Sequence, residues 1–263
     1  MGFSVVAGAA GSSVILHVPH AARAVTDRVR EELLITGGEL GEELDQLTDA
    51  HTDVIAAEAA AGGAVRPWIF ENGLSRLVVD PERFLGEAEE MRAVGMGAIY
   101  THGYAGRRLR DDSPVREQAA LQEHYRPYAR GLAALVADRI AVTGRAVILD
   151  VHSYSTEALP YELHGAGPRP PICLGTDHFH TPAALVAAAV AAFPEAGFNT
   201  PFAGCYVPAD RWRTDARVAA LMIEIRRDTY MIEPGGPHHA GLAVVAGRLA
   251  ALIDAVSADE PVS

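Results

Sequence analysis

Two short apolar runs in this chain each end in a histidine, and they constrain the fold more than any other feature. The first reads LHVPHA over residues 16–21 and the second reads VILDVHS over residues 147–153. His20 and His152 therefore both stand where a predicted buried strand ends. In open α/β sheets, ligands bind beyond the carboxyl ends of the strands. We expect a sheet that brings these two histidines to one site.

The elements around these runs predict an α/β fold, with residues 1–263 forming a single domain of three layers. A central mixed, mostly parallel sheet is expected to be flanked by helices. We expect a hairpin between 68–70 and 77–79, and an active-site loop over 95–115. Further strands are expected at 14–18, 146–151, 172–174 and 219–225, and helices at 25–36, 42–60, 115–142, 183–193 and 239–256.

Composition excludes several classes of function. A formal net charge of −12, with 22 basic against 34 acidic residues, argues against a nucleic-acid or membrane partner. No stretch reaches the ~18 uninterrupted apolar residues of a membrane span, and the apolar start lacks the basic region of a signal peptide. Cys173 and Cys205 form one disulfide at most, and we expect free thiols in a cytoplasmic protein. The oligomeric state stays open.

Two histidines at strand ends together predict a metal site. A catalytic zinc ion takes three protein ligands and keeps a fourth position for water. His20 and His152 therefore need a third ligand, for which we favour Asp49 in the segment LTDAHTD. His51 and Asp53 are the alternatives: either one is the third ligand instead of Asp49, or they form hydrogen bonds to the ligands.

Two further carboxylates follow from the strand patterns. Asp150 stands two residues before His152 on the same strand face, so we predict that it orients His152 through the second ring nitrogen. Glu224 lies inside the apolar run ALMIEIRRD, and a buried carboxylate must be paired, protonated or functional. It either pairs with Arg226 or Arg227, binds metal, or acts as a general base. We favour the general base, because burial raises its pKa towards neutrality.

Arg76 and Arg83 lie seven residues apart in the segment SRLVVDPERF. Both arginines either lie on the surface or serve the site, where a guanidinium stabilises an oxyanion or binds a carboxylate through two hydrogen bonds. An acidic protein that binds a small anionic amino-acid derivative needs such residues.

The motifs VPHA, LTDAH, SRLVVDPERF, HYRPY, LDVHS, GCYVP and IEIRRDTYM occur in an order that resembles the N-formylglutamate amidohydrolase family. This family is a branch of the zinc-carboxypeptidase-like and aspartoacylase-like hydrolases. The resemblance covers about residues 14–231 and implies a zinc-carboxypeptidase-like fold. It also implies an enzyme that uses Zn²⁺, or another divalent transition metal, to cleave the linear amide of an N-formyl or other N-acyl amino acid.

The resemblance also implies roles for individual residues. His20, Asp49 and His152 are the metal ligands, and Glu224 activates the water. The remaining roles are oxyanion stabilisation by Arg76, and substrate binding by Arg83 with Arg227 as its second candidate.

One segment departs from the family pattern, because DPER stands where the family has D-L-N-R. Pro81 and Glu82 replace Leu and Asn, so a negative charge lies beside Arg83. A second hypothesis therefore keeps the site and changes the substrate to other N-acyl amino acids or small peptides. A third hypothesis is a non-catalytic metal-binding protein, in which an arginine seals Glu224 in the core and no pocket opens at the metal.

Overall fold

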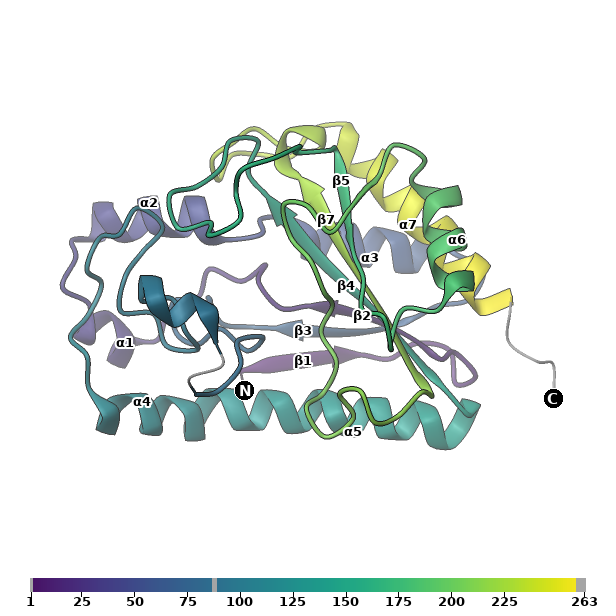
Figure 1. The fold of residues 1–263 in the computed structure, drawn as a ribbon, viewed down its shortest axis with the longest axis horizontal. Coiled ribbons are helices and arrows are strands. Elements are labelled where there is room, and N and C mark those ends of the chain that lie inside the picture. Colours follow the sequence, from purple (N-terminus) through teal and green to yellow (C-terminus); the bar gives the residue numbers. More distant parts are fainter. Residues whose placement is uncertain (1, 87–88, 259–263) are drawn as a thin grey trace.

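A mixed sheet forms the centre of the computed structural model, which describes residues 2–86 and 89–258. Within them, seven strands pair in the order β1-β3-β2-β4-β7-β5-β6 (Figure 1). Strands β3, β2, β4 and β7 run parallel, while β1 and β5 pair antiparallel with β3 and β7. The predicted α/β fold with a mostly parallel sheet is confirmed. The strands are β1 (Phe3–Val6), β2 (Val14–Val18), β3 (Trp68–Asn72), β4 (Ala146–Tyr154), β5 (Ile172–Gly175), β6 (Gly197–Phe198) and β7 (Val218–Arg226).

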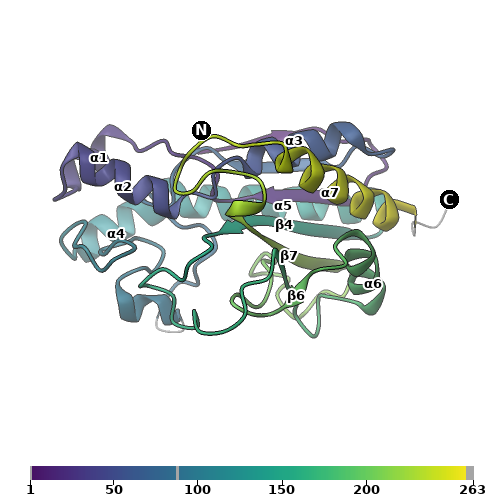
Figure 2. The same ribbon diagram turned by 90° about the horizontal axis from the view of Figure 1, so that it is seen from above.

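Helices cover both faces of this sheet and complete three layers. Helices α3, α6 and α7 lie on one face, and the long α5 crosses the other (Figures 1 and 2). A single π-helical turn, Leu121–Tyr125, joins α4 to α5, which confirms the long helix predicted over 115–142. The helices are α1 (Asp27–Glu32), α2 (Gly37–Leu47), α3 (Thr52–Gly62), α4 (Pro114–Ala120), α5 (Arg126–Thr143), α6 (Ala183–Ala192) and α7 (Gly241–Ala258).

Alternation along the central strands separates an apolar face from a face of mixed polarity. Leu16, Leu149 and Leu221 lie in the core beneath α3, α6 and α7. Ile15 and Ile148 point the other way and pack with α5. Because side chains alternate with a period of two, every second residue of these strands returns to the α5 face.

The same α5 face becomes polar towards the carboxyl ends of the strands. His17 on β2 stands opposite Asp150 on β4, and His152 on β4 stands opposite Glu224 on β7. Directly paired residues of neighbouring strands share a face, so strand register alone gathers these four side chains. The position of the site therefore follows from the sheet.

The predicted hairpin between 68–70 and 77–79 is wrong. Residues 76–78 form a turn, in which the Val78 N–H donates to the Ser75 carbonyl. Strand β3 pairs instead with β1 and β2. The antiparallel partner comes from the extreme amino terminus, so the chain after β3 is free to turn towards the site.

The single helix predicted over 42–60 is also wrong, because residues 48–51 interrupt it. The backbone N–H of Asp49 donates to the carbonyl of His20, and His51 adopts a left-handed φ of 67°. Thr36 and Glu39 form a capping box, so Gly37 begins α2 where we expected the glycines to end a helix. Asp49 consequently lies in a turn against the end of β2.

The helix predicted over 239–256 corresponds to α7, and both cysteines were predicted to be free thiols. By length and composition α7 passes for a membrane-spanning helix, although half of it is buried in this structure. It packs against α3 and α6. Cys173 and Cys205 are both free, as expected.

The alternation of the central strands yields a stability prediction. Leu149→Ala removes a fully buried side chain from β4, so the free energy of unfolding should fall by about 2–5 kcal/mol. Leu34 is 58% exposed, and Leu34→Ala should change it by no more than about 0.5 kcal/mol. Urea unfolding of both variants measures the difference. Equal losses would contradict the assignment of β4 to the core.

Candidate active site

Three predicted metal ligands meet at the carboxyl ends of β2 and β4. His20 follows β2, His152 lies on β4, and Asp49 lies in the turn between α2 and α3. The two Nδ1 atoms of the histidines are 3.3 Å apart, and Asp49 Oδ2 is 3.2 Å from His152 Nδ1 and 3.6 Å from His20 Nδ1. A tetrahedral zinc ion with bonds of about 2.0–2.1 Å holds its ligand atoms roughly 3.3 Å apart. The spacing of these three ligand atoms, from His20, Asp49 and His152, therefore fits a metal ion. We call these three residues the ligand triangle.

Each histidine also meets a carboxylate at its second ring nitrogen. His20 Nε2 lies 2.9 Å from Asp80 Oδ1, and His152 Nε2 lies 3.0 Å from Oδ1 of Asp150, the carboxylate we predicted beside it, although these two atoms are not aligned for a hydrogen bond. Carboxylates at this position fix the tautomer and the ring orientation of metal-binding histidines. Both Nδ1 atoms are thereby left on the side of Asp49. We did not predict Asp80, because nothing in the sequence signals its contact with His20.

Asp80 also brings both predicted arginines to the site. It is fully buried, and its Oδ2 accepts a 2.6 Å hydrogen bond from the Tyr100 hydroxyl. Arg76 Nη2 and Arg83 Nε each lie 3.3 Å from the same oxygen. Arg76 Nη2 is also 2.9 and 3.1 Å from the two ring nitrogens of His20, which places its guanidinium over the imidazole.

Arg227 holds the third predicted ligand in place. Its Nη2 donates to Asp49 Oδ1 at 3.3 Å, its Nη1 donates to the Gln46 carbonyl and its Nε donates to Ser153 Oγ. The residue is only 3% exposed. Substrate binding by Arg227 stays a prediction, and the contacts described here place its guanidinium against Asp49.

His51 and Asp53 do not join the cluster. His51 Nε2 lies 3.0 Å from the Gly236 carbonyl, and its ring packs against His238. Asp53 lies in the first turn of α3, on the other side of the interruption. Among the described residues, neither belongs to a group whose ligand atoms could share a metal ion.

Glu82 and His17 are parts of the site that sequence reasoning missed. Glu82 Oε2 lies 3.3 Å from His152 Nε2 and 3.6 Å from His20 Nδ1, while its Oε1 is 3.6 Å from His17 Nδ1. His17 was passed over because it lies inside a strand. Aligning VILHV with VILDV would have paired it with Asp150.

The carboxylates give the histidine pair a strong attraction for positive charge. Burial disfavours a charged imidazole, but Asp80 and Asp49 raise the pKa of His20, and Asp150 and Glu82 raise that of His152 well above its usual value. Burial would raise the pKa of Asp49, but hydrogen bonds to both histidines hold it below its usual range. One divalent cation carries the same charge as the two protons it would replace, so the donor set fits a metal.

Glu224 lies beside the predicted ligands and lines the same cavity. It is 7% exposed and pairs in register with His152 across β4 and β7. Its Oε2 has no hydrogen-bond partner among the described residues. Burial, aided by the charge of Asp49, raises its pKa to about 7. The predicted environment of a general base is therefore present.

A cavity of about 500 Å³ opens onto this cluster. Glu224, Arg76 and Arg83 line it, together with apolar side chains such as Leu159 and Phe202. Among the described residues, none of the loop over 95–115 lines the cavity, and Tyr100 of this loop contacts Asp80. A non-catalytic metal-binding protein predicts no pocket at this place, so the cavity argues against that hypothesis.

Comparison with known proteins agrees with this geometry. The sequence profile of the N-formylglutamate amidohydrolase family matches residues 12–231. The fold is similar to the crystal structure of an N-formylglutamate amidohydrolase from Ralstonia eutropha JMP134, with a TM-score of 0.82 and 21% identity over 98% of each chain. A gene product of Agrobacterium tumefaciens aligns with a TM-score of 0.69 and 19% identity, over 99% of this chain and 96% of its own. The sequence matches none of the curated proteins.

The raised pKa values of His20 and His152 predict proton release on metal binding. At pH 7 an ordinary histidine is mostly neutral, whereas a raised pKa increases the fraction of each imidazole that carries a proton, and metal binding displaces that proton. Zinc binding to the metal-free protein should therefore release protons at pH 7, and affinity should rise with pH. Titration calorimetry in buffers of different ionisation enthalpy measures the release. A binding heat that is independent of the buffer would contradict this prediction.

Proposed function

Because the chain belongs to the N-formylglutamate amidohydrolase family, we propose that it is a metal-dependent enzyme that hydrolyses the amide bond of an N-formyl or other N-acyl amino acid. Family membership makes it an amidohydrolase. The single observation that carries the mechanism is Glu224, a buried carboxylate with an unpartnered oxygen beside the ligand triangle.

His20, Asp49 and His152 would hold the metal, with Asp80 and Asp150 orienting the two histidines. When bound, the ion polarises the amide carbonyl and lowers the pKa of water. Two imidazole nitrogens and one carboxylate oxygen suit Zn²⁺, and other divalent transition metals accept the same donors.

Glu224 would move the protons of the reaction. Hydrolysis needs a group that accepts a proton from the attacking water and returns it to the leaving amine. A pKa of about 7 allows both steps near neutral pH, because neither protonation state is strongly preferred. The side chain lines the cavity although the residue is only 7% exposed, so the carboxyl group is within reach of a bound substrate.

Two of the three arginines that line the cavity would bind the substrate at different atoms. Arg76 lies over His20, where it would stabilise the oxyanion of the tetrahedral intermediate, a contribution of about 3–4 kcal/mol for one such donor. Arg83 has a side chain that is 24% exposed in the cavity and would bind the substrate carboxylate. Arg227 would act indirectly, through Asp49.

The charges of the cavity favour the second substrate class, N-acyl amino acids other than N-formylglutamate. Each of its three arginines already pairs with a protein carboxylate. Glu82 adds a negative charge that faces the histidine pair. A substrate with one carboxylate and an uncharged side chain meets less repulsion here than a dicarboxylate does. The carboxylates that line the cavity are Asp49, Glu82, Glu90, Glu162 and Glu224, and the arginines are Arg76, Arg83 and Arg227.

We also propose that the enzyme acts in the cytoplasm on small molecules. Free Cys173 and Cys205 are typical of a reducing compartment. The net charge of −12 is unfavourable for nucleic acid and for anionic membranes.

The general-base role predicts the behaviour of Glu224→Gln. The amide keeps the shape of the side chain but accepts no proton, so kcat should fall about 10²–10⁴-fold. Zinc affinity should stay within a few-fold of wild type, because Glu224 is no ligand of the triangle. Steady-state kinetics and metal analysis of one preparation test both statements. Full turnover with metal bound would show that another group takes the proton.

The charge of Glu82 predicts a shift in substrate preference. In Glu82→Asn, the ratio of kcat/KM for N-formylglutamate to that for N-formylleucine should rise, because repulsion of the second carboxylate is removed. Glu58 is exposed on α3, and Glu58→Gln serves as the matched control with an unchanged ratio. If wild type already prefers N-formylglutamate by a wide margin, the second substrate class is rejected.

A further inference from the structure

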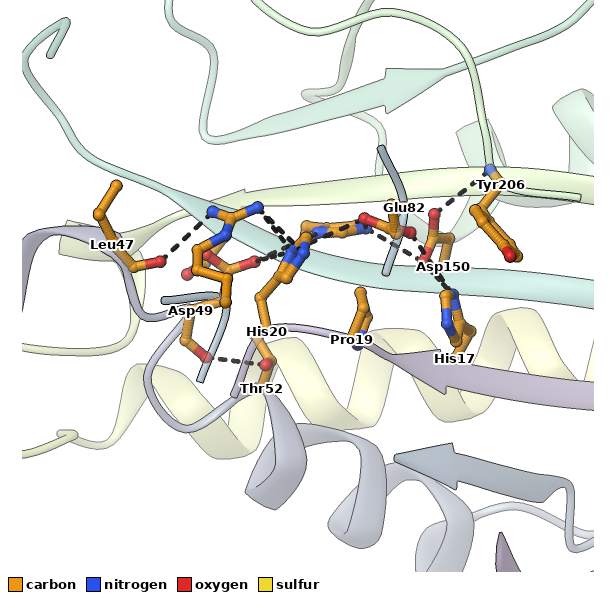
Figure 3. A network of polar contacts seen from close by, with 12 residues as sticks. His17, Pro19, His20, Leu47, Asp49, Thr52, Glu82, Asp150 and Tyr206 are labelled. Carbon is orange, nitrogen blue, oxygen red and sulfur yellow. Dashed lines mark hydrogen bonds and ion pairs between the residues drawn. The ribbon is translucent and has the colours of Figure 1, made fainter. Parts of the chain in front are cut away.

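A buried chain of polar contacts lies behind His152 on the side of α5. His17, fully buried on β2, has its Nδ1 2.8 Å from Asp150 Oδ1 and its Nε2 2.5 Å from the Tyr128 hydroxyl on α5. The same Asp150 oxygen lies 3.0 Å from His152 Nε2. Three elements, α5, β2 and β4, thus connect Tyr128 to a predicted metal ligand, and Figure 3 shows the part between His17 and Asp150.

We propose that His17 and Tyr128 are positioning residues of the metal centre. They act through Asp150 to hold the imidazole of His152 with Nδ1 available to a metal ion. This inference rests on the proposed metal-dependent function. It gives a positioning role to two residues that take no part in the reaction itself.

The hydrogen-bonding roles in this chain follow from the chemistry of its members. An ionised carboxylate only accepts, so His17 Nδ1 must donate to Asp150. When Nδ1 carries the ring's single proton, Nε2 presents a lone pair that accepts from the Tyr128 hydroxyl. Burial raises the pKa of Tyr128 well above its usual value, so the hydroxyl remains a donor. Tyr128 therefore selects the tautomer of His17 that can bind Asp150.

Asp150 is fixed from two directions that do not involve a metal. His17 contacts Oδ1, and the backbone N–H of Tyr206 donates to Oδ2 at 3.4 Å. A carboxylate held in this way keeps one orientation before the ion arrives. The side chain of His152 then loses less conformational entropy when it binds a metal ion, because its orientation is already restricted.

Packing alone does not account for this histidine. Ile15 precedes His17 by two residues on β2, and Ile148 precedes Asp150 by two residues on β4. Both isoleucines lie on the same face of the sheet as His17 and pack against α5. A buried imidazole must have both nitrogens hydrogen-bonded to avoid a desolvation cost, whereas an aliphatic side chain has no such need. His17 occurs where this face changes from core to site.

A comparison of two buried histidines tests the proposal. His180 is also fully buried, with Nδ1 2.7 Å from the Val218 carbonyl and Nε2 accepting from the Arg213 N–H, but it has no contact with the ligand triangle. Zinc affinity is measured by competition with a chromophoric chelator, using metal-free protein whose folding is checked by circular dichroism. The variants are Tyr128→Phe, His17→Phe, His17→Asn and the control His180→Phe.

Tyr128→Phe and His17→Phe should weaken zinc binding about 10–100-fold, as loss of a group that orients a ligand does. His17→Asn should recover part of the affinity, because its amide N–H still donates to Asp150 from the position of Nδ1. His180→Phe should lower the melting temperature and leave affinity within about twofold of wild type. A folded Tyr128→Phe with wild-type affinity, or an equal loss in His180→Phe, would overturn the positioning role. A wild-type protein that binds no divalent transition metal would instead overturn the proposed function, and this inference with it.

Discussion

The structure depends on the neutralisation of carboxylates that are buried at one end of the sheet. Asp49, Asp80 and Asp150 have almost no access to solvent, and an unpaired buried charge costs several kcal/mol. Histidines and arginines from distant parts of the chain pair with each of them. The remainder of the fold, from the break between α2 and α3 to the turn after β3, serves to bring these partners together.

Local patterns in the sequence were sufficient for the central strands β2, β4 and β7, and they placed one histidine just after β2 and one near the end of β4. A buried strand in the centre of a parallel sheet reads as an apolar run, and its end is marked by the first polar residues. These patterns placed His20, His152 and Glu224 in one cluster, and the short distance between Asp150 and His152 follows from the period of two along one strand; their roles stay predictions.

The contacts that were missed join elements far apart in sequence. Asp80 reaches His20 only because β3 takes its antiparallel partner from the amino terminus, which no local signal in 68–79 reveals. Asp49 reaches its place because the end of β2 accepts its backbone N–H, and this tertiary contact outweighs the helical pattern over 42–60. The position of Glu82 and the role of Arg227 depend on the same long-range packing.

Because side chains alternate with a period of two along β2 and β4, the site forms only when these strands pair in the native register. A slip of one residue in either strand would move its histidine or aspartate to the face beneath α3 and α7, among leucine and isoleucine side chains. The ligand triangle draws on residues 20, 49 and 152, so it forms only when more than half of the chain has found its native pairing. A cation bound there would stabilise the native topology relative to misaligned sheets of similar hydrophobicity, because only the native register places the three ligands together.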